Sequence, residues 1–342
     1  MKILCLTFIL LCSFVFIVAQ DAEIAIIPQP VKIEKGSVPF VLNEKTMIVG
    51  AGGNSQAAAR ALRDGIRRAT GFSLADKPGE GFNVSNGDIV FGIFSPANDT
   101  LGNEGYRIDV NDKILSVNAN TPAGLFYGVQ TLLQLLPKEI ESKTIVRNKT
   151  WAIPAVRITD YPRFAWRGMM FDVVRHFFTK DQVKQFIDEM VRYKYNLLHL
   201  HLTDDQGWRI EIKTLPKLTE VGAWRVDKTG TFGTFSAPAA NEPRTYGGFY
   251  THDDIKELVK YASDRFVNIL PEVDVPGHSM AAVASYPDLS CTPGKYVVNS
   301  GEKFMEWGVG SAGFSALVDN TLCPANEKDR KSTRLNSSHP YR

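Results

Sequence analysis

The sequence predicts an α/β fold: the start of a (β/α)8 TIM barrel, preceded by an α+β accessory domain. Three strand-like runs, at residues 168–174, 196–202 and 266–278, each end in charged or polar residues. Amphipathic stretches separate them, one at residues 179–190 and one that starts near residue 251. Because the first crossover is short, its two strands are expected to be parallel neighbours with a right-handed connection. The repetition of the pattern indicates successive β-α units. We expect only the first three or so of the eight units in this chain.

The first amphipathic stretch is predicted to be a helix with a defined start. Thr179 can act as the N-cap, and Gln182, three residues later, can close a capping box. The apolar positions follow the i, i+3, i+4, i+7 spacing of one buried helix face: Val183, Phe186, Ile187 and Met190. The sequence therefore predicts strand, helix and strand in succession.

Ionisable residues collect where the three predicted strands end. They are Asp172, Arg175 and His176 after the first strand, His199, His201, Asp204 and Asp205 in and after the second, and Glu272, Asp274 and His278 in the third. Ligands bind at the carboxyl ends of parallel strands in such folds. We therefore expect the functional site at this end of the sheet.

Residues 21–152 are predicted to form the accessory domain, and residues 153–328 the N-terminal part of the barrel. In the accessory domain, helices are expected at residues 55–69 and 121–136, with Pro122 in the favoured first turn. Residues 106–110 and 114–119 are expected to form a hairpin. The accessory sequence contains no motif for a nucleophile, a metal cluster or a phosphate-binding loop.

Residues 1–20 have one lysine, a long apolar run and Ala19 before a polar stretch, which is the pattern of a signal peptide. The protein is therefore expected to be exported, periplasmic or secreted, with no membrane span after cleavage. An uncleaved membrane anchor is the alternative. Cys291 and Cys323 are the two cysteines beyond the leader, and an oxidising compartment favours a disulfide between them over two free thiols.

The charge distribution gives no indication of a nucleic-acid partner. The formal net charge is +2, but Lys2 and the basic residues 329–342 account for more than that excess. The body of the chain is slightly acidic and has no basic patch.

Five sequence blocks occur in order along the chain: RGMMFDVVRHFF, HLHLTDDQGWRIEI, LPKLTEVGAWR, GGFYT and LPEVDVPGH. In this order and spacing they resemble the β-N-acetylhexosaminidases of glycoside hydrolase family 20. The resemblance covers most of the chain, because the predicted accessory domain, including the IPQP segment that starts at Ile27, is similar to the accessory domain of that family.

The resemblance implies a retaining exo-glycosidase acting on glycans or chito-oligosaccharides that end in N-acetylhexosamine. Such enzymes release terminal N-acetylglucosamine or N-acetylgalactosamine from the non-reducing end. The substrate's own 2-acetamido oxygen attacks the anomeric carbon, so the resemblance implies no protein nucleophile, metal or cofactor. The protein supplies a general acid and a carboxylate that orients the acetamido group.

The resemblance also implies roles for four residues. Arg175 would grip sugar hydroxyls with its forked donors, although Val174 replaces the serine that commonly precedes this arginine. Asp204 and His278 would form a relay behind the general acid. Asp274 would contribute to substrate binding by steadying Arg175.

The general acid itself is expected to be missing from this chain. In the family it is the glutamate of an Asp-Glu pair that closes the fourth strand, and no such pair follows Cys323. The resemblance ends with LCPANEK, and residues 329–342 have no apolar periodicity, as expected for a non-native tail. We therefore expect a truncated reading frame whose product is inactive as written.

Two other classes of function remain open at this stage. His199 and His201 alternate on one predicted strand near two aspartates, as in metal-dependent barrel hydrolases. A non-catalytic sugar-binding protein is the other alternative, since the general acid is absent. Sensitivity to chelators would favour the first alternative, and binding without turnover would favour the second.

Overall fold

The computed structural model describes residues 24–77, 84–228, 238–239, 241–291, 294–300 and 322–323. The predicted leader at residues 1–20 and the predicted tail at residues 329–342 lie outside these ranges. None of the helices in the described ranges has the length and apolar character needed to cross a membrane.

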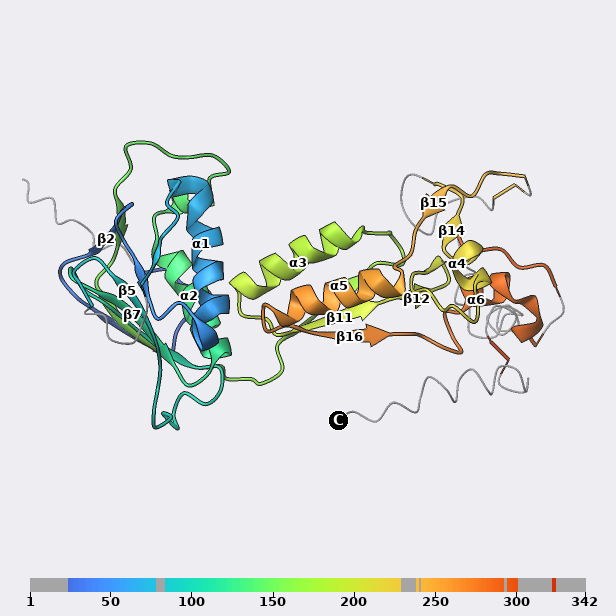
Figure 1. Ribbon diagram of the computed structural model, residues 1–342. Helices are drawn as coiled ribbons and strands as arrows, with labels where there is room; N and C mark the ends of the chain where they lie inside the picture. The colour runs from blue at the N-terminus through green and yellow to red at the C-terminus, as the bar shows by residue number, and fades with distance from the viewer. Residues whose placement is uncertain are drawn as a thin grey trace, which may run out of the picture.

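The N-terminal part is built on a seven-stranded sheet with two helices on one face (Figure 1). The strand order is β1-β9-β6-β7-β5-β3-β4. The bounds are β1 Lys32–Lys35, β3 Ile48–Val49, β4 Asp76–Lys77, β5 Ile89–Ile93, β6 Tyr106–Val110, β7 Leu115–Ala119 and β9 Val156–Asp160. A separate antiparallel pair joins β2 (Phe40–Leu42) to β8 (Trp151–Ile153). The predicted hairpin is confirmed as the antiparallel pair of β6 and β7.

Both predicted helices of this part are present and begin and end as local chemistry requires. Helix α1 (Gln56–Thr70) ends at Gly71, whose φ of 77° is the left-handed cap that glycine adopts readily. Helix α2 (Pro122–Leu135) begins after Thr121, whose hydroxyl accepts a hydrogen bond from the backbone N–H of Gly124. Alternate side chains of β6 and β7 are buried beneath these helices, as a sheet with one covered face requires.

The accessory sheet includes residues beyond the predicted boundary at residue 152. Strand β9 pairs antiparallel with both β1 and β6. It is therefore an interior strand of this sheet, second from one edge, and the chain leaves the sheet only after Asp160. Strand β9 follows β8 after a break of two residues, with no linker-like sequence between them. The sequence therefore contains no local signal that this sheet extends past residue 152.

The second part contains three parallel strands in the order β10-β11-β16. They are β10 (Gly168–Asp172), β11 (Leu197–His201) and β16 (Asn268–Glu272), and α3 (Lys180–Arg192) and α5 (His252–Ser263) pack over them. The predicted parallel pairing of neighbours is confirmed. The capping box of Thr179 and Gln182 is present at the start of α3, and Thr251 makes a matching box with Asp254 at α5.

Shorter elements gather beyond the carboxyl ends of these strands, at the opposite end of the molecule from the accessory sheet (Figure 1). They are β12 (Thr203–Asp204), β13 (Gly207–Trp208), α4 (Lys217–Glu220), β14 (Trp224–Arg225), β15 (Tyr246–Gly247), α6 (Met280–Ser285) and the 3-10 turn Pro287–Leu289. Two further 3-10 turns, Gly53–Ser55 and Lys138–Glu141, belong to the N-terminal part. A small apolar cluster around Trp208, Leu218 and Val283 anchors them. Cys291 and Cys323 are joined by a disulfide in this structure.

A buried polar group joins the accessory sheet to the loop after α3. The ammonium of Lys194 lies 3.0 Å from Asp160 Oδ2 and donates to the hydroxyl oxygen of Tyr106 at 2.7 Å. The Tyr106 hydroxyl donates to the same carboxylate oxygen at 2.6 Å. Nearby, Arg167 pairs with Glu104 at 2.8 Å. These contacts hold the two parts of the chain together through charges that are shielded from water.

Candidate active site

The candidate site lies where β10, β11 and β16 end. Register places Asp172, His201 and Glu272 side by side, because Asp172 pairs with His201 and His201 pairs with Glu272 across the three strands. Every second side chain along a strand lies on the same face of the sheet. His199 therefore lies on the same face as His201, while Leu198 and Leu200 are buried on the other face of the sheet.

Arg175 is held by two carboxylates. Its Nη1 donates to Asp172 Oδ2 at 2.8 Å, and its Nη2 lies 2.6 Å from Asp204 Oδ2. Asp172 also accepts hydrogen bonds from the backbone N–H groups of Val174 and Arg175. Burial alone would raise the pKa of Asp172, but these N–H donors and the guanidinium outweigh burial and lower it.

The expected contact between Asp274 and Arg175 is not seen. Within the described ranges, Arg175 pairs with Asp172 and Asp204 instead. The backbone N–H of Asp274 donates to the hydroxyl of Thr203 at 2.9 Å, which ties this part of the loop after β16 to β12. The loop after β16 is therefore held to β12 by a hydrogen bond to a side chain, while Arg175 pairs with the carboxylates of Asp172 and Asp204.

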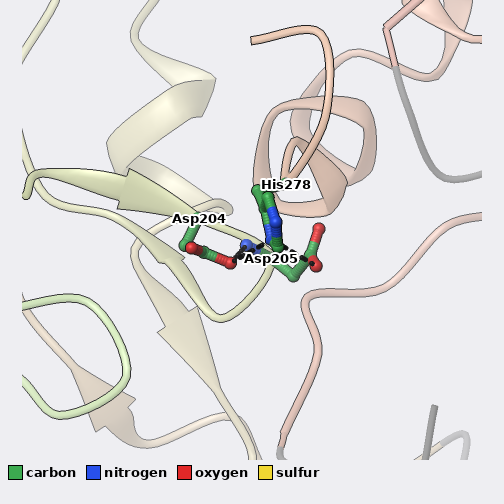
Figure 2. A group of neighbouring side chains, drawn as sticks. All are labelled: Asp204, Asp205 and His278. Atoms are coloured by element: carbon green, nitrogen blue, oxygen red, sulfur yellow. Dashed lines mark hydrogen bonds and ion pairs between the residues drawn. The ribbon is translucent and has the colours of Figure 1, made fainter. Parts of the chain in front are cut away.

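Asp204 is the centre of the site and its side chain is only 1% exposed. Oδ1 accepts a hydrogen bond from the backbone N–H of Asp205 at 2.7 Å and lies 3.2 Å from His278 Nδ1. Figure 2 shows His278 directed at both aspartates, with Asp205 Oδ2 at 3.6 Å from the same nitrogen. Burial raises the pKa of Asp205, and the backbone N–H of Met280 opposes that rise. The structure thus brings together Asp204 and His278, the two residues predicted to form a relay.

His201 lies behind Asp204 with its ring almost fully buried. Its Nε2 lies 3.0 Å from Asp204 Oδ2, and its Nδ1 lies 3.0 Å from Glu272 Oε1. The other oxygen of Glu272 lies 2.5 Å from His199 Nε2. The hydrogen bond to Asp204 is the main cause that raises the pKa of His201, and burial opposes it.

Two buried arginines hold the backbone around Arg175. The guanidinium of Arg209, 0% exposed, donates to the carbonyl oxygens of Val174 at 2.7 Å and Ala223 at 2.6 Å. Arg225 donates to the carbonyl oxygen of Arg175 at 2.8 Å. Burial lowers the pKa of Arg209 to about 10, so this side chain remains cationic at neutral pH.

The side chains do not assemble the metal site that His199 and His201 could have formed. Both rings face oxygens of Glu272, and the two nitrogens of His201 are flanked by carboxylates. One other group of ligand-type atoms lies within 4.8 Å in the described ranges, from Asp204, Asp205 and His278. Hydrogen bonds and ion pairs already account for their approach to one another.

Glu272, Asp172 and Arg209 have structural roles that the sequence analysis did not assign. Asp172 and Glu272 stood among the polar residues at the strand ends, and correct register across three strands would have placed them beside His201. No sequence signal identified Arg209, because its partners are backbone carbonyl oxygens from distant loops.

Comparison with known proteins gives two family models that together cover most of the chain. The model for the catalytic domain of glycosyl hydrolase family 20 matches residues 164–328, and the model for domain 2 of that family matches residues 23–161. The second match, like β9, extends past residue 152.

Individual relatives agree with these matches. A β-hexosaminidase of Porphyromonas gingivalis is 39% identical over 324 residues, which cover 94% of this chain and 39% of that protein. The solved GH20 β-N-acetylhexosaminidase from Streptomyces coelicolor A3(2) is similar with a TM-score of 0.73 and 35% identity, covering 90% of this chain and 55% of its own. A mutant Streptomyces plicatus β-hexosaminidase in complex with the product GlcNAc has the same TM-score and 36% identity, with 90% and 54% covered. This chain therefore spans between about two fifths and just over half of the length of these relatives.

Proposed function

Because the chain belongs to glycosyl hydrolase family 20, we propose that it carries part of the site of an exported, exo-acting β-N-acetylhexosaminidase. The proposed substrates are glycans or chito-oligosaccharides with a terminal N-acetylglucosamine or N-acetylgalactosamine. The reaction proceeds with retention, through attack of the substrate's own 2-acetamido oxygen on the anomeric carbon. In this proposal β10, β11 and β16 are the first three strands of a (β/α)8 barrel.

The observation that carries this proposal is the single carboxylate shared by Arg175 and His278. Asp204 contacts Arg175 through Oδ2 and His278 through Oδ1. The side chain of Asp204 is 1% exposed and that of His278 is 55% exposed, so only the histidine of this pair can reach a group on the open side of the site. This difference in exposure supports a role for Asp204 in orienting His278, and a role for His278 in contacting a proton donor.

The chemistry of each residue follows from its contacts. Asp204 Oδ1 lies 3.2 Å from Nδ1 of His278. A proton on Nδ1 would pair with this carboxylate and leave Nε2 free to meet the proposed general acid and to influence the pKa of that acid. Arg175 is one-third exposed, and donors of its guanidinium that are not used by Asp172 and Asp204 can bind sugar hydroxyls. Asp274 remains a proposed substrate contact, through its own carboxylate and independently of Arg175.

The proton donor is proposed to be the glutamate of an Asp-Glu pair, and no such pair follows Cys323 in the printed sequence. We therefore expect the 342-residue chain to bind N-acetylglucosamine weakly and to give no turnover. The test measures binding by saturation-transfer NMR and turnover on a chromogenic aryl N-acetyl-β-glucosaminide. Turnover that His278→Ala abolishes would support the activity but would show that the proton donor lies within this chain.

Variants of arginine separate sugar recognition from general effects of charge. Arg175→Lys keeps the charge but loses the planar fork, so sugar binding should weaken by one to two orders of magnitude, about 1.4 to 3 kcal/mol. Arg157→Lys, at an exposed ion pair of the accessory sheet, is the matched control and should bind as the unmodified chain does. Equal binding by both variants, or no binding by the unmodified chain, would contradict the proposed site.

A further inference from the structure

His201 occupies a position that the proposed reaction does not use. Its ring is 3% exposed and lies between two carboxylates, with Asp204 Oδ2 at 3.0 Å from Nε2 and Glu272 Oε1 at 3.0 Å from Nδ1. The other oxygen of Glu272 contacts His199, so His199, Glu272, His201 and Asp204 form one continuous chain of titratable side chains.

The protons on His201 follow from this geometry. A neutral imidazole has one N–H and one lone pair. A lone pair directed at a carboxylate oxygen 3.0 Å away is repulsive, whereas an N–H there is attractive. Since both ring nitrogens of His201 face carboxylate oxygens, the doubly protonated ring is the form that satisfies both sides. The contact with Glu272 is an ion pair without the alignment of a hydrogen bond, and the contact with Asp204 is a hydrogen bond.

Other charged groups also surround the His201 ring. His201 faces Asp172 of β10, Glu272 of β16, and Asp204 and His199 from its own segment, and Arg175 Nη1 lies 3.2 Å from Nε2. Arg175 opposes a proton on Nε2, but the carboxylate of Asp204 binds both cations through the same oxygen. Three carboxylates against one guanidinium leave a net negative environment, which favours the cationic ring.

We propose that His201 is a positioning residue that carries a proton on both ring nitrogens and holds Asp204 in the orientation in which Asp204 meets His278. Glu272 anchors the far side of the ring from β16. Asp204 Oδ2 is thereby fixed by His201 and Arg175, and Oδ1 is left to face His278. The proposal depends on the proposed function in one respect only, which is the role assigned there to His278.

The test reads the protonation of each ring without any substrate. Two-bond 1H–15N correlation spectra of the 15N-labelled chain distinguish the imidazolium from the two neutral tautomers, and the six histidines are assigned by single substitutions. At neutral pH we expect the imidazolium pattern for His201, and for His278 a proton on Nδ1. Glu272→Gln should remove the imidazolium pattern of His201, leaving a proton on Nε2 alone.

A second variant tests the effect on His278. His201→Gln removes the charge, and His278 should then lose its preference for Nδ1–H and populate both tautomers. His252→Gln, at the exposed start of α5, is the matched control and should change neither pattern. A neutral His201 in the unmodified chain, or a His278 pattern that His201→Gln leaves unchanged, would overturn the proposal.

The measurement remains decisive if His201→Gln fails to fold, because the unmodified chain alone reports the state of His201. Its outcome is also separable from that of the proposed function. A chain that neither binds nor hydrolyses the sugar but shows the two expected patterns would refute the function and leave the positioning role in place.

Discussion

Replacing Lys194 with methionine should destabilise the junction between the two parts of the chain by about 3 kcal/mol. Methionine keeps most of the buried stem and meets the same backbone strain at φ 62°, so the change removes mainly the charge. The Lys194 and Asp160 side chains are 9% and 11% exposed. Removing one partner of a buried ion pair costs about 3 to 5 kcal/mol because the other charge stays buried.

The lower end of that range is expected because Asp160 keeps other donors. The Tyr106 hydroxyl donates to it at 2.6 Å and the backbone N–H of Val31 at 3.3 Å. Burial lowers the pKa of Lys194 in spite of Asp160, so pairing does not fully offset the loss of water around the ammonium. The double variant Lys194→Met/Asp160→Asn should therefore be more stable than Lys194→Met alone.

The assay is urea unfolding followed by far-UV circular dichroism, with the free energies combined in a double-mutant cycle. Lys256→Met is the control, because the Lys256 and Asp253 side chains are 77% and 90% exposed and such a pair contributes little. A loss below about 1 kcal/mol for Lys194→Met, or additive effects in the double variant, would refute this reasoning.

Four other outcomes are expected. Leu198→Ala should lower the unfolding free energy by about 2 to 5 kcal/mol, since this 0%-exposed side chain of β11 leaves a cavity under the helices; a smaller loss would mean that the helices collapse onto the strand. Thr251→Ala should cost about 1 kcal/mol through loss of the capping box, measured by thermal unfolding. Hydrogen bonding to Asp204 raises the pKa of His201. The stabilisation that the protonated ring contributes is therefore fully present below the ordinary pKa of 6.5 and is lost as the pH rises through the raised pKa. In His201→Gln, the pH dependence of the unfolding free energy should lack this slope. Peptide mapping without reductant should recover Cys291 and Cys323 in one linked fragment.

Local pattern was sufficient for helices α1, α2, α3 and α5 and for the order of the three parallel strands. The capping boxes and the apolar spacing of α3 depend on residues within one or two turns of each other, so the sequence alone contains the signal. The parallel pairing of β10 with β11 follows from a short crossover and the handedness of β-α-β connections. The disulfide was the favoured outcome for the two cysteines beyond the leader, and the structure joins them.

The positions of polar residues at the strand ends also identified the candidate site, but they did not show which of its side chains pair with one another. The strand ends placed Arg175, Asp204 and His278 at one edge because parallel strands end together. Sequence resemblance linked Asp204 to His278, and the structure brings these two residues within 3.2 Å. The expected link from Asp274 to Arg175 is not among the contacts of the described residues, where Arg175 pairs with Asp172 and Asp204 and the backbone of Asp274 is tied to β12.

Only the tertiary structure decided which charges meet and where the first part of the chain ends. Strand β9 belongs to the accessory sheet because β1 and β6 supply its hydrogen-bond partners from far away in sequence. Glu272 reaches His201 through the register of β16 on β11, and Arg209 reaches carbonyl oxygens of separate loops. The sequence by itself determined the longer helices, the three parallel strands and the edge at which polar residues collect, because these depend on local periodicity and chain direction. The pairing of those residues required the tertiary structure, because a contact of about 3 Å depends on register and loop path across segments that are distant along the chain.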